Sequence, residues 1–221
     1  YAAGKIGAEP AVKGQSLIYT VSARGRLVEP DEFGDIVIRS TAGGGVISTG
    51  STGQVVPVHP AAAELQGLRA YRSLETYDGA VDLAVVAVPA AHVDEVVDKC
   101  LAGGVRAICI ISAGFGECSE DGRRRERALV ERARLVGCRI IGPNCMGLLN
   151  THPDVRLNAT FSPVYPPEGT VAMSTQSGAL GLAILDYTRS LALGISSFAS
   201  IGNKGDVSRN DLLGHWAARP W

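Results

Sequence analysis

The sequence predicts an α/β fold built on a parallel sheet, and the middle of the chain carries the observations behind this prediction. A short valine-rich apolar run at 82–88 is typical of a buried parallel strand. Apolar residues in 91–104 recur at helical spacing before a pair of glycines. A second strand is predicted at 106–112, a second helix at 120–136 and a third strand at 138–141. This alternation predicts a βαβαβ unit with right-handed crossovers.

A proline-rich stretch separates this unit from the second half of the chain. Four prolines lie between Pro153 and Pro167, which excludes a continuous helix or a central strand there. The elements predicted next are a strand, a helix, a strand and the start of a helix, at 170–174, 178–192, 194–200 and 209–218. The first of these helices has five apolar residues in register, namely Leu180, Ala183, Ile184, Tyr187 and Leu191.

These patterns predict the domain organisation. We expect a first domain at 53–152, a connection at 153–168 and the first part of a second α/β domain at 169–221. Residues 53–59 are predicted to add a further strand to the first sheet. Residues 1–52 contain glycine-rich stretches with no clear strand before them and no clear helix after them, so their fold stays unassigned.

Composition excludes several classes of function. The net charge of -1 provides no basic surface for nucleic acid, and no apolar stretch approaches the ~20 residues of a membrane span. The spacing of the histidines suits no metal site. No CxxC pair occurs among the five cysteines, so we expect reduced thiols in a cytoplasmic protein. Because the chain starts at Tyr1 and its only methionines are Met146 and Met173, we expect a piece of a longer protein.

Three turns of the first domain are candidate ligand-binding segments. Ligands of doubly wound sheets bind beyond the carboxyl ends of the strands, where 88–92, 111–117 and 140–147 are expected to lie. Gly114 and Gly116 would let the backbone approach a ligand closely. Each turn alone has the plain interpretation of a strand-to-helix connection. Together, at one edge of one sheet, they favour a shared binding site.

A fourth turn, Ser174 to Gly178, connects a predicted strand to a predicted helix. Free N–H groups and the dipole at the start of that helix would suit a phosphate, and serine hydroxyls would add donors. Capping of the helix by serine explains the same residues, and both interpretations stay open. Cys145 is a weak candidate nucleophile, since no histidine is fixed beside it. The arginine run at 123–127 favours a solvated helix face.

Several motifs together resemble a known family. The segments GPNCMGLLNT, STQSGALG and SIGNKGDVSRNDLL are similar to the CoA-binding and succinyl-CoA-ligase-like domains of ADP-forming acyl-CoA synthetases. The segments DLAVVAVPAAHVDEVVDKC, ISAGFGE and VRLNATFSP fit the same family in the same order, so the likeness covers 53–221. The resemblance implies a Rossmann-like CoA-binding domain followed by a truncated flavodoxin-like domain.

The resemblance also implies roles for the four turns. It implies CoA-binding residues in the first domain, namely Val88, Pro89, Ala90, Ile111, Ser112, Ala113, Gly114, Phe115, Asn144 and Cys145. It implies a phosphate or phosphohistidine site formed by Ser174, Thr175, Gln176, Ser177 and Gly178. The family reaction is acyl-CoA + ADP + phosphate ⇌ carboxylate + ATP + CoA, through an acyl phosphate and a phosphorylated histidine. That histidine is expected beyond position 221, so the chain holds no catalytic residue and we expect no complete ligase activity from it.

The resemblance has departures and leaves alternatives. His59 and Ala61 stand where the family often has an amide and a lysine, and nothing in 1–50 resembles its first glycine-rich turn. ATP, ADP and Mg²⁺ would bind only through an ATP-grasp domain or β subunit, and the acyl group and the choice of ADP or GDP stay open. An alternative is a CoA-sensing module fused to a GNAT-type acetyltransferase. A third alternative is an NAD-binding Rossmann domain. It would require a GxGxxG motif at its first turn, and the sequence shows none.

Overall fold

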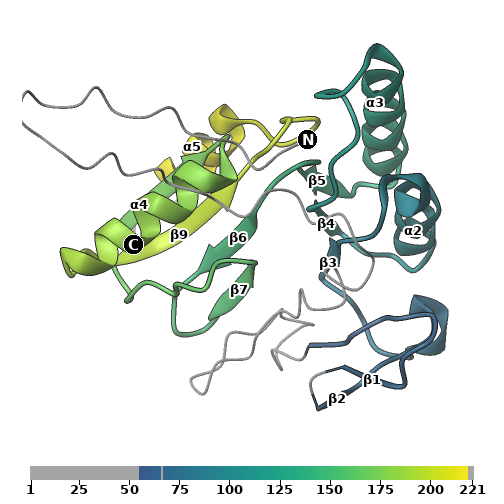
Figure 1. The fold of residues 1–221 in the computed structure, drawn as a ribbon, viewed down its shortest axis with the longest axis horizontal. Helices are drawn as coiled ribbons and strands as arrows, with labels where there is room; N and C mark the ends of the chain where they lie inside the picture. Colours follow the sequence, from purple (N-terminus) through teal and green to yellow (C-terminus); the bar gives the residue numbers. More distant parts are fainter. Residues whose placement is uncertain (1–54, 66, 219–221) are drawn as a thin grey trace, which may run out of the picture. The chain divides into compact units, whose positions relative to one another are not determined.

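The computed structural model describes residues 55–65 and 67–218, all of them within one compact unit. Its first half contains the predicted βαβαβ unit (Figure 1). The elements are β3 (Leu83–Val86), α2 (Ala90–Ala102), β4 (Ala107–Ile110), α3 (Glu120–Leu135) and β5 (Arg139–Ile141). The three strands are parallel in the order β3-β4-β5, which confirms the α/β prediction.

Helices α2 and α3 lie side by side and cover one face of this sheet (Figure 1). Their apolar stripes contribute Val93, Val97 and Leu129 to a core that also contains Ile108 and Ile140 from the strands. The sheet buries these residues almost completely, as the valine- and isoleucine-rich sequence of a parallel strand requires.

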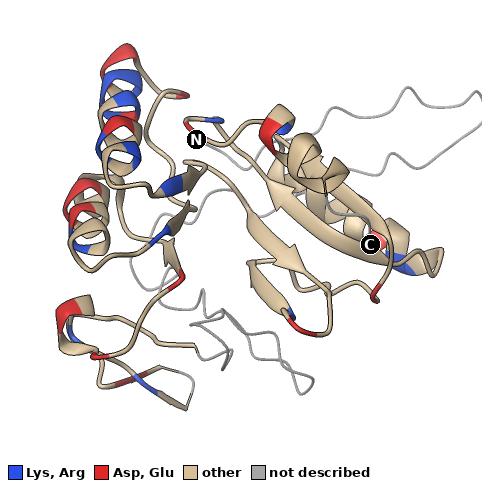
Figure 2. Cartoon of the chain, turned by 180° about the vertical axis from the view of Figure 1, so that it is seen from behind, with Lys and Arg blue, Asp and Glu red and all other residues tan. Residues whose placement is uncertain are grey.

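Ion pairs tie the two helices together at their surface. Arg132 donates to Asp94 and to Asp98, both at 2.9 Å, and Arg125 donates to Asp94 at 2.6 Å. The amino end of α3 is capped by Ser119, whose side chain accepts the Gly122 N–H. Figure 2 shows acidic and basic residues along both helices.

The second half of the chain forms a mixed sheet in the order β7-β6-β9-β8. Its elements are β6 (Gly147–Asn150), β7 (Leu157–Thr160), β8 (Val171–Thr175), α4 (Gly178–Ser190), β9 (Ile195–Ser200) and α5 (Arg209–Ala217). Strands β8 and β9 are parallel, while β6 is antiparallel to both β7 and β9. Met146, Leu149, Leu185, Ile195 and Phe198 form its core.

The two halves are joined differently from the expected organisation. Strand β6 lies inside the segment 53–152 but pairs with strands of the second sheet. Strand β7 lies inside the proline-rich segment 153–168, at the edge of the sheet. An edge strand is compatible with nearby prolines because one side of its backbone needs no partner. The proline-rich segment is therefore more than a connection.

The strand predicted at 53–59 is wrong for the residues of that segment that the structure describes. Within 55–59, only an isolated bridge joins Val58 to Tyr71, outside the β3-β4-β5 sheet. Pro57 and Pro60 lack the N–H groups that a ladder needs. The chain instead forms a short hairpin, β1 (Glu64–Leu65) with β2 (Leu68–Arg69), and a 3-10 turn, η2 (Leu74–Thr76), before β3.

Helix α4 confirms the predicted helix but presents an unexpected face to the sheet. The buried residues are Gly181, Leu185 and Thr188, whereas Leu180 and Tyr187 of the apolar register are 55% and 65% exposed. A Cβ at position 181 would lie only 2.7 Å from the Phe198 ring. The helix therefore approaches the sheet through its small residues, which periodicity of apolar residues does not reveal.

No helix among the described residues is long and apolar enough to cross a membrane. No group of three or more histidine, cysteine, aspartate or glutamate side chains in that part of the chain could hold a metal ion.

Candidate functional site

The three turns of the first domain meet at the carboxyl edge of its sheet. The Ser112 hydroxyl, after β4, donates to the carbonyl oxygen of Val88, after β3, at 2.5 Å. The Asn144 N–H, after β5, donates to the carbonyl oxygen of Ser112 at 2.9 Å. Pro89 and Ala90 stand at the start of α2, next to this contact. Hydrogen bonds thus connect three segments that are separate in the sequence.

The turn after β4 folds back on itself. Gly114 has φ +109°, and a Cβ there would lie 2.9 Å from the Cβ of Ala90. The Glu117 carboxylate accepts the Gly114 N–H at 2.5 Å and the Phe115 N–H at 3.2 Å. Partial burial opposes its ionisation, but hydrogen bonds from Asn203 and from these amides outweigh it and hold the pKa of Glu117 below its ordinary value. The N–H groups of Gly114 and Phe115 therefore already have an acceptor, the protein's own Glu117 carboxylate.

A loop of the second domain completes this cluster. The Asn203 side-chain amide donates to Glu117 at 2.6 Å and to Glu126 at 2.9 Å, and its oxygen accepts from the Asn144 amide at 3.3 Å. Glu126, which is 8% exposed, also accepts the Gly116 N–H at 3.1 Å. The sequence alone predicted no role for Asn203 or for Glu126, although Asn203 lies within one of the family-like motifs. The one available signal for Glu126 was its position as an acidic residue within the arginine run at 123–127.

The same loop is fixed to the first sheet by a buried carboxylate. The side chain of Asp206 has no exposed surface and accepts from Arg134 and Arg139 at 2.7 and 2.8 Å and from the Ile140 N–H at 2.8 Å. Burial acts against its charge, but these donors outweigh burial and lower the pKa of Asp206. The Val207 N–H donates to the Ile140 carbonyl, so the loop covers the edge of β5.

Cys145 is buried against the end of β4. Its thiol donates to the Ile110 carbonyl at 3.2 Å, and its sulfur lies 3.6 Å from that of Cys109. None of these contacts involves a histidine. No disulfide joins the cysteines of the described residues.

The fourth turn is capped by serine and also keeps free donors. The Ser177 hydroxyl accepts the Leu180 N–H at 3.3 Å, and the Thr175 hydroxyl donates to the Ser177 carbonyl at 3.1 Å. Within the described residues, no hydrogen bond involves the N–H groups of Gly178 and Ala179. Capping and anion binding are therefore compatible, since each uses different amides.

The fourth turn lies close to the segment that carries Asn144 and Cys145. A Cβ on Gly178 would lie 3.2 Å from the Cβ of Met146. The Met146 N–H donates to the Ser200 hydroxyl at 3.0 Å, and the Ile201 N–H donates to the Thr175 carbonyl at 2.8 Å. These contacts bring the carboxyl ends of β8 and β9 to the segment after β5. Ser174 lies within β8, just before its last residue, and Gln176 is exposed in the turn that follows.

Arg125 departs from the solvated face predicted for the arginine run. Arg124 and Arg123 are exposed and pair with acidic residues three positions earlier. Arg125 instead donates to the Ala90 carbonyl at 3.0 Å, and its guanidinium lies 5.2 Å from the centre of the Phe115 ring. This cation therefore supports two of the candidate turns.

His59, at a departure from the family pattern, binds its own backbone. Its Nδ1 accepts the N–H groups of Ala61 and Ala62 at 3.1 and 2.8 Å. An acceptor nitrogen carries no proton, so the neutral ring has its proton on Nε2. The imidazole thus stabilises a local turn.

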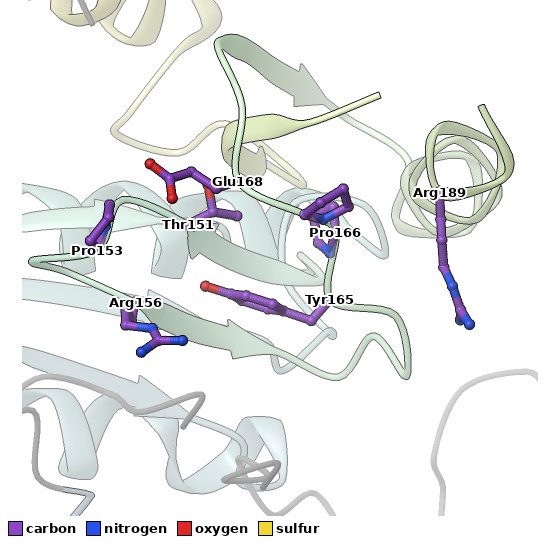
Figure 3. Close-up of a pocket in the computed structure, with 8 residues that line it drawn as sticks. Thr151, Pro153, Arg156, Tyr165, Pro166, Glu168 and Arg189 are labelled. Atoms are coloured by element: carbon purple, nitrogen blue, oxygen red, sulfur yellow. The ribbon is translucent and has the colours of Figure 1, made fainter. Parts of the chain in front are cut away.

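A pocket of about 680 Å³ lies away from these turns (Figure 3). It is lined by Thr151, Pro153, Arg156, Tyr165, Pro166, Pro167, Glu168 and Arg189, none of which was a predicted site residue. The Tyr165 hydroxyl donates to the Asn150 carbonyl at the far end of β6, and Glu168 precedes β8. The pocket therefore belongs to the amino ends of β8 and β9.

Comparisons with known proteins agree with the sequence resemblance. A family of CoA binding domains matches residues 25–151, and a family of succinyl-CoA ligase like flavodoxin domains matches residues 168–221. The chain is 46% identical over 165 residues to the α subunit of an ADP-forming acetate–CoA ligase II of Pyrococcus furiosus, covering 75% of this chain and 35% of the relative. It is 42% identical over 161 residues to an ADP-forming acetate–CoA ligase of Methanocaldococcus jannaschii, covering 73% of this chain and 22% of the relative.

A solved structure shares the fold. The dinucleotide forming acetyl-coenzyme A synthetase 1 of Ca. Korarchaeum cryptofilum, in complex with phosphate and ADP, superimposes with a TM-score of 0.72 at 42% identity. The match covers 79% of this chain and 37% of the synthetase chain. The chain thus spans well under half the length of these relatives. None of these findings favours the acetyltransferase alternative.

Proposed function

Because the chain belongs to the ADP-forming acyl-CoA synthetase family, as its CoA-binding domain and the first part of its succinyl-CoA-ligase-like domain, we propose that it supplies the CoA site of such a synthetase. The reaction is acyl-CoA + ADP + phosphate ⇌ carboxylate + ATP + CoA. The thiol of CoA supplies the group that accepts and releases the acyl chain. The chain's own residues bind and orient the reactants.

We propose that CoA lies along the turns 88–90 and 111–115 and reaches Asn144 and Cys145. The observation that carries this proposal is the pair of hydrogen bonds that join Val88, Ser112 and Asn144 at one edge of the sheet. The chemistry of the donors limits the contact: the amides of Gly114 to Gly116 already bind Glu117 and Glu126. CoA would therefore meet side chains and carbonyl groups here, and its phosphates would need other donors.

We propose that Ser174 to Gly178 holds the phosphate that moves between substrates. The free N–H groups of Gly178 and Ala179 at the start of α4 are suited to an oxyanion, and the helix dipole favours its charge. Met146 lies between this turn and Asn144, so a phosphate here would be near the proposed CoA site.

ATP, ADP and Mg²⁺ would bind to an ATP-grasp domain or β subunit, with the chain acting as part of the α subunit. We expect the 221-residue chain alone to form no acyl-CoA from ATP, CoA and a carboxylate. An assay with acetate, the substrate named for the relatives, tests this; turnover by the purified chain would contradict it.

Calorimetric titration of the full chain with CoA tests the central proposal, with NAD as the control ligand. We expect binding of CoA and none of NAD. Asn144 has φ +58°, so Asn144→Gly keeps the backbone unstrained while removing the side-chain amide. We expect this variant to bind CoA at least ~10-fold more weakly, equivalent to about 1.4 kcal/mol.

Asn210→Ala is the matched control, because Asn210 is exposed on α5 and its side chain makes no hydrogen bond to the described turns. Its CoA affinity should equal that of the unmodified chain. Absence of CoA binding by a folded chain, or equal losses in both variants, would contradict the proposed site.

A further inference from the structure

Two cysteines, of which the proposed function uses only Cys145, have their sulfur atoms in contact. The sulfurs of Cys109 and Cys145 are 3.6 Å apart, and the two residues are 0% and 5% exposed. Cys109 belongs to β4, the central strand of the first sheet, while Cys145 belongs to the segment after β5. The packing of two distant segments therefore creates a thiol pair.

The other cysteines differ from this pair. Cys118 is exposed, whereas Cys100 and Cys138 are buried. Burial raises the pKa of Cys100 to about 11, and the contact with Cys145 together with burial also raises the pKa of Cys109, so the pair is marked by its sulfur–sulfur distance and not by an acidic thiol. A metal is an unsuitable occupant of the pair, because no third histidine, cysteine or acidic ligand joins it in the described part of the chain.

We propose that Cys109 and Cys145 are a thiol–disulfide exchange site, at which a low-molecular-weight disulfide converts the pair into an internal disulfide. The proposal goes beyond CoA binding and does not depend on it. A disulfide bond has a sulfur–sulfur length near 2 Å, so the two sulfurs must approach by roughly 1.5 Å. Side-chain rotation and a small shift of the segment after β5 provide this movement more easily than β4, which pairs on both sides.

The exchange proceeds in two steps whose atoms and electrons balance. The thiolate of Cys145, the more exposed of the two, attacks one sulfur of the disulfide R–S–S–R and releases R–S⁻, which leaves a mixed disulfide. The thiolate of Cys109 then attacks the Cys145 sulfur, forms the internal bond and releases the second R–S⁻. The two protons lost by the cysteines end on the released thiols. The pair is oxidised, and the small disulfide is reduced to two thiols.

The exchange would change the candidate site directly. Cys145 loses the proton that it donates to the Ile110 carbonyl, and its neighbour Asn144 becomes covalently tied to β4. Small disulfides include the oxidised form of CoA itself, but the chemistry is common to the class.

The test is incubation of the full chain with glutathione disulfide, followed by intact-mass and peptide mapping. Cys118→Ser is the background, since this exposed thiol would otherwise form mixed disulfides. We expect the mass to fall by about 2 Da, the mapped bond to join Cys109 and Cys145, and dithiothreitol to reverse the change. In Cys109→Ala, we expect the reaction to stop at glutathione bound to Cys145.

A pair that stays reduced, while the same treatment modifies Cys118 in the unmodified chain, would overturn the proposal. A bond mapped to Cys100 and Cys138 would overturn it as well. The mass change is measured without CoA, so a chain that fails to bind CoA would contradict the proposed function and leave this test intact.

Discussion

The turn after β4 and the turn after β8 have similar positions in their sheets, but they differ in whether their backbone N–H groups have acceptors. Glu117 fills the amides of Gly114 and Phe115, and Asn203 fixes that carboxylate from the other domain. The turn after β8 leaves the N–H groups of Gly178 and Ala179 without partners in the described chain. The first turn is therefore built for shape, and the second is suited to an anion.

The two turns also differ in what fixes them. The first depends on contacts that cross between the domains, above all the loop that carries Asn203 and Asp206. The second depends on its own serine cap and on the close packing of α4 against β9. Variants that remove one kind of support at a time should therefore separate the two turns.

The largest effect is expected from Asp206→Ala. Removal of this carboxylate leaves Arg134, Arg139 and the Ile140 N–H without their shared acceptor and detaches the loop from the first sheet. Loss of one partner of a buried ion pair costs about 3–5 kcal/mol; the arginines are half-exposed, so we expect about 3 kcal/mol. Urea unfolding measures the change. Asp121→Ala, in an exposed pair with Arg124, is the control and should change the free energy of unfolding by ~0.5 kcal/mol or less.

The same carboxylate predicts the direction of pH dependence. The pKa of Asp206 is lower in the folded chain than in the unfolded chain, so the unfolded state binds its proton first as pH falls. Its stabilising contribution is present above the unfolded pKa and is lost as pH falls through the folded pKa. Asp206→Asn should flatten the acid limb of the stability profile. An unchanged acid limb would contradict this role.

The next effect tests the packing of α4. In Gly181→Ala the new Cβ would lie 2.7 Å from the Phe198 ring and 2.8 Å from the Thr175 methyl group. Overpacking of this kind costs about 1–3 kcal/mol. Gly214→Ala on α5 is the matched control, because nothing lies within 4 Å of its Cβ position and alanine favours a helix. Thermal unfolding should show a loss for the first variant and a gain of up to ~1 kcal/mol for the second.

The sequence predicted the elements of the fold better than their pairing. Local periodicity is enough to locate β3, α2 and β4, because strands and helices have different spacings of apolar residues. It does not reveal that β6 pairs with β9, since that pairing joins residues about fifty positions apart. It also missed the buried face of α4, where a glycine rather than an apolar side chain makes the contact.

The candidate site was predictable in outline for a similar reason. Parallel topology brings the carboxyl ends of neighbouring strands together, so Ser112 and Asn144 could be placed at one edge from the order of elements. The acceptor of the Gly114 N–H could not be predicted, because nothing in the sequence distinguishes Glu117 from a glutamate that faces solvent. Asn203 reaches the cluster only through the packing of the two domains.

The smallest effect separates the two turns most sharply. Ser177→Ala removes the oxygen that caps the Leu180 N–H, and loss of a serine cap costs about 1 kcal/mol. Ser177→Gly should cost only a few tenths of that, because glycine also suits the cap position. If the turn binds phosphate through the Gly178 and Ala179 amides, both variants should keep phosphate affinity within about twofold in calorimetry once their stability is matched by temperature. A loss tenfold or greater in both would mean that the hydroxyl, rather than the free amides, holds the anion. Neither variant should change CoA binding at the turn after β4, whose support comes from Glu117 and Asn203.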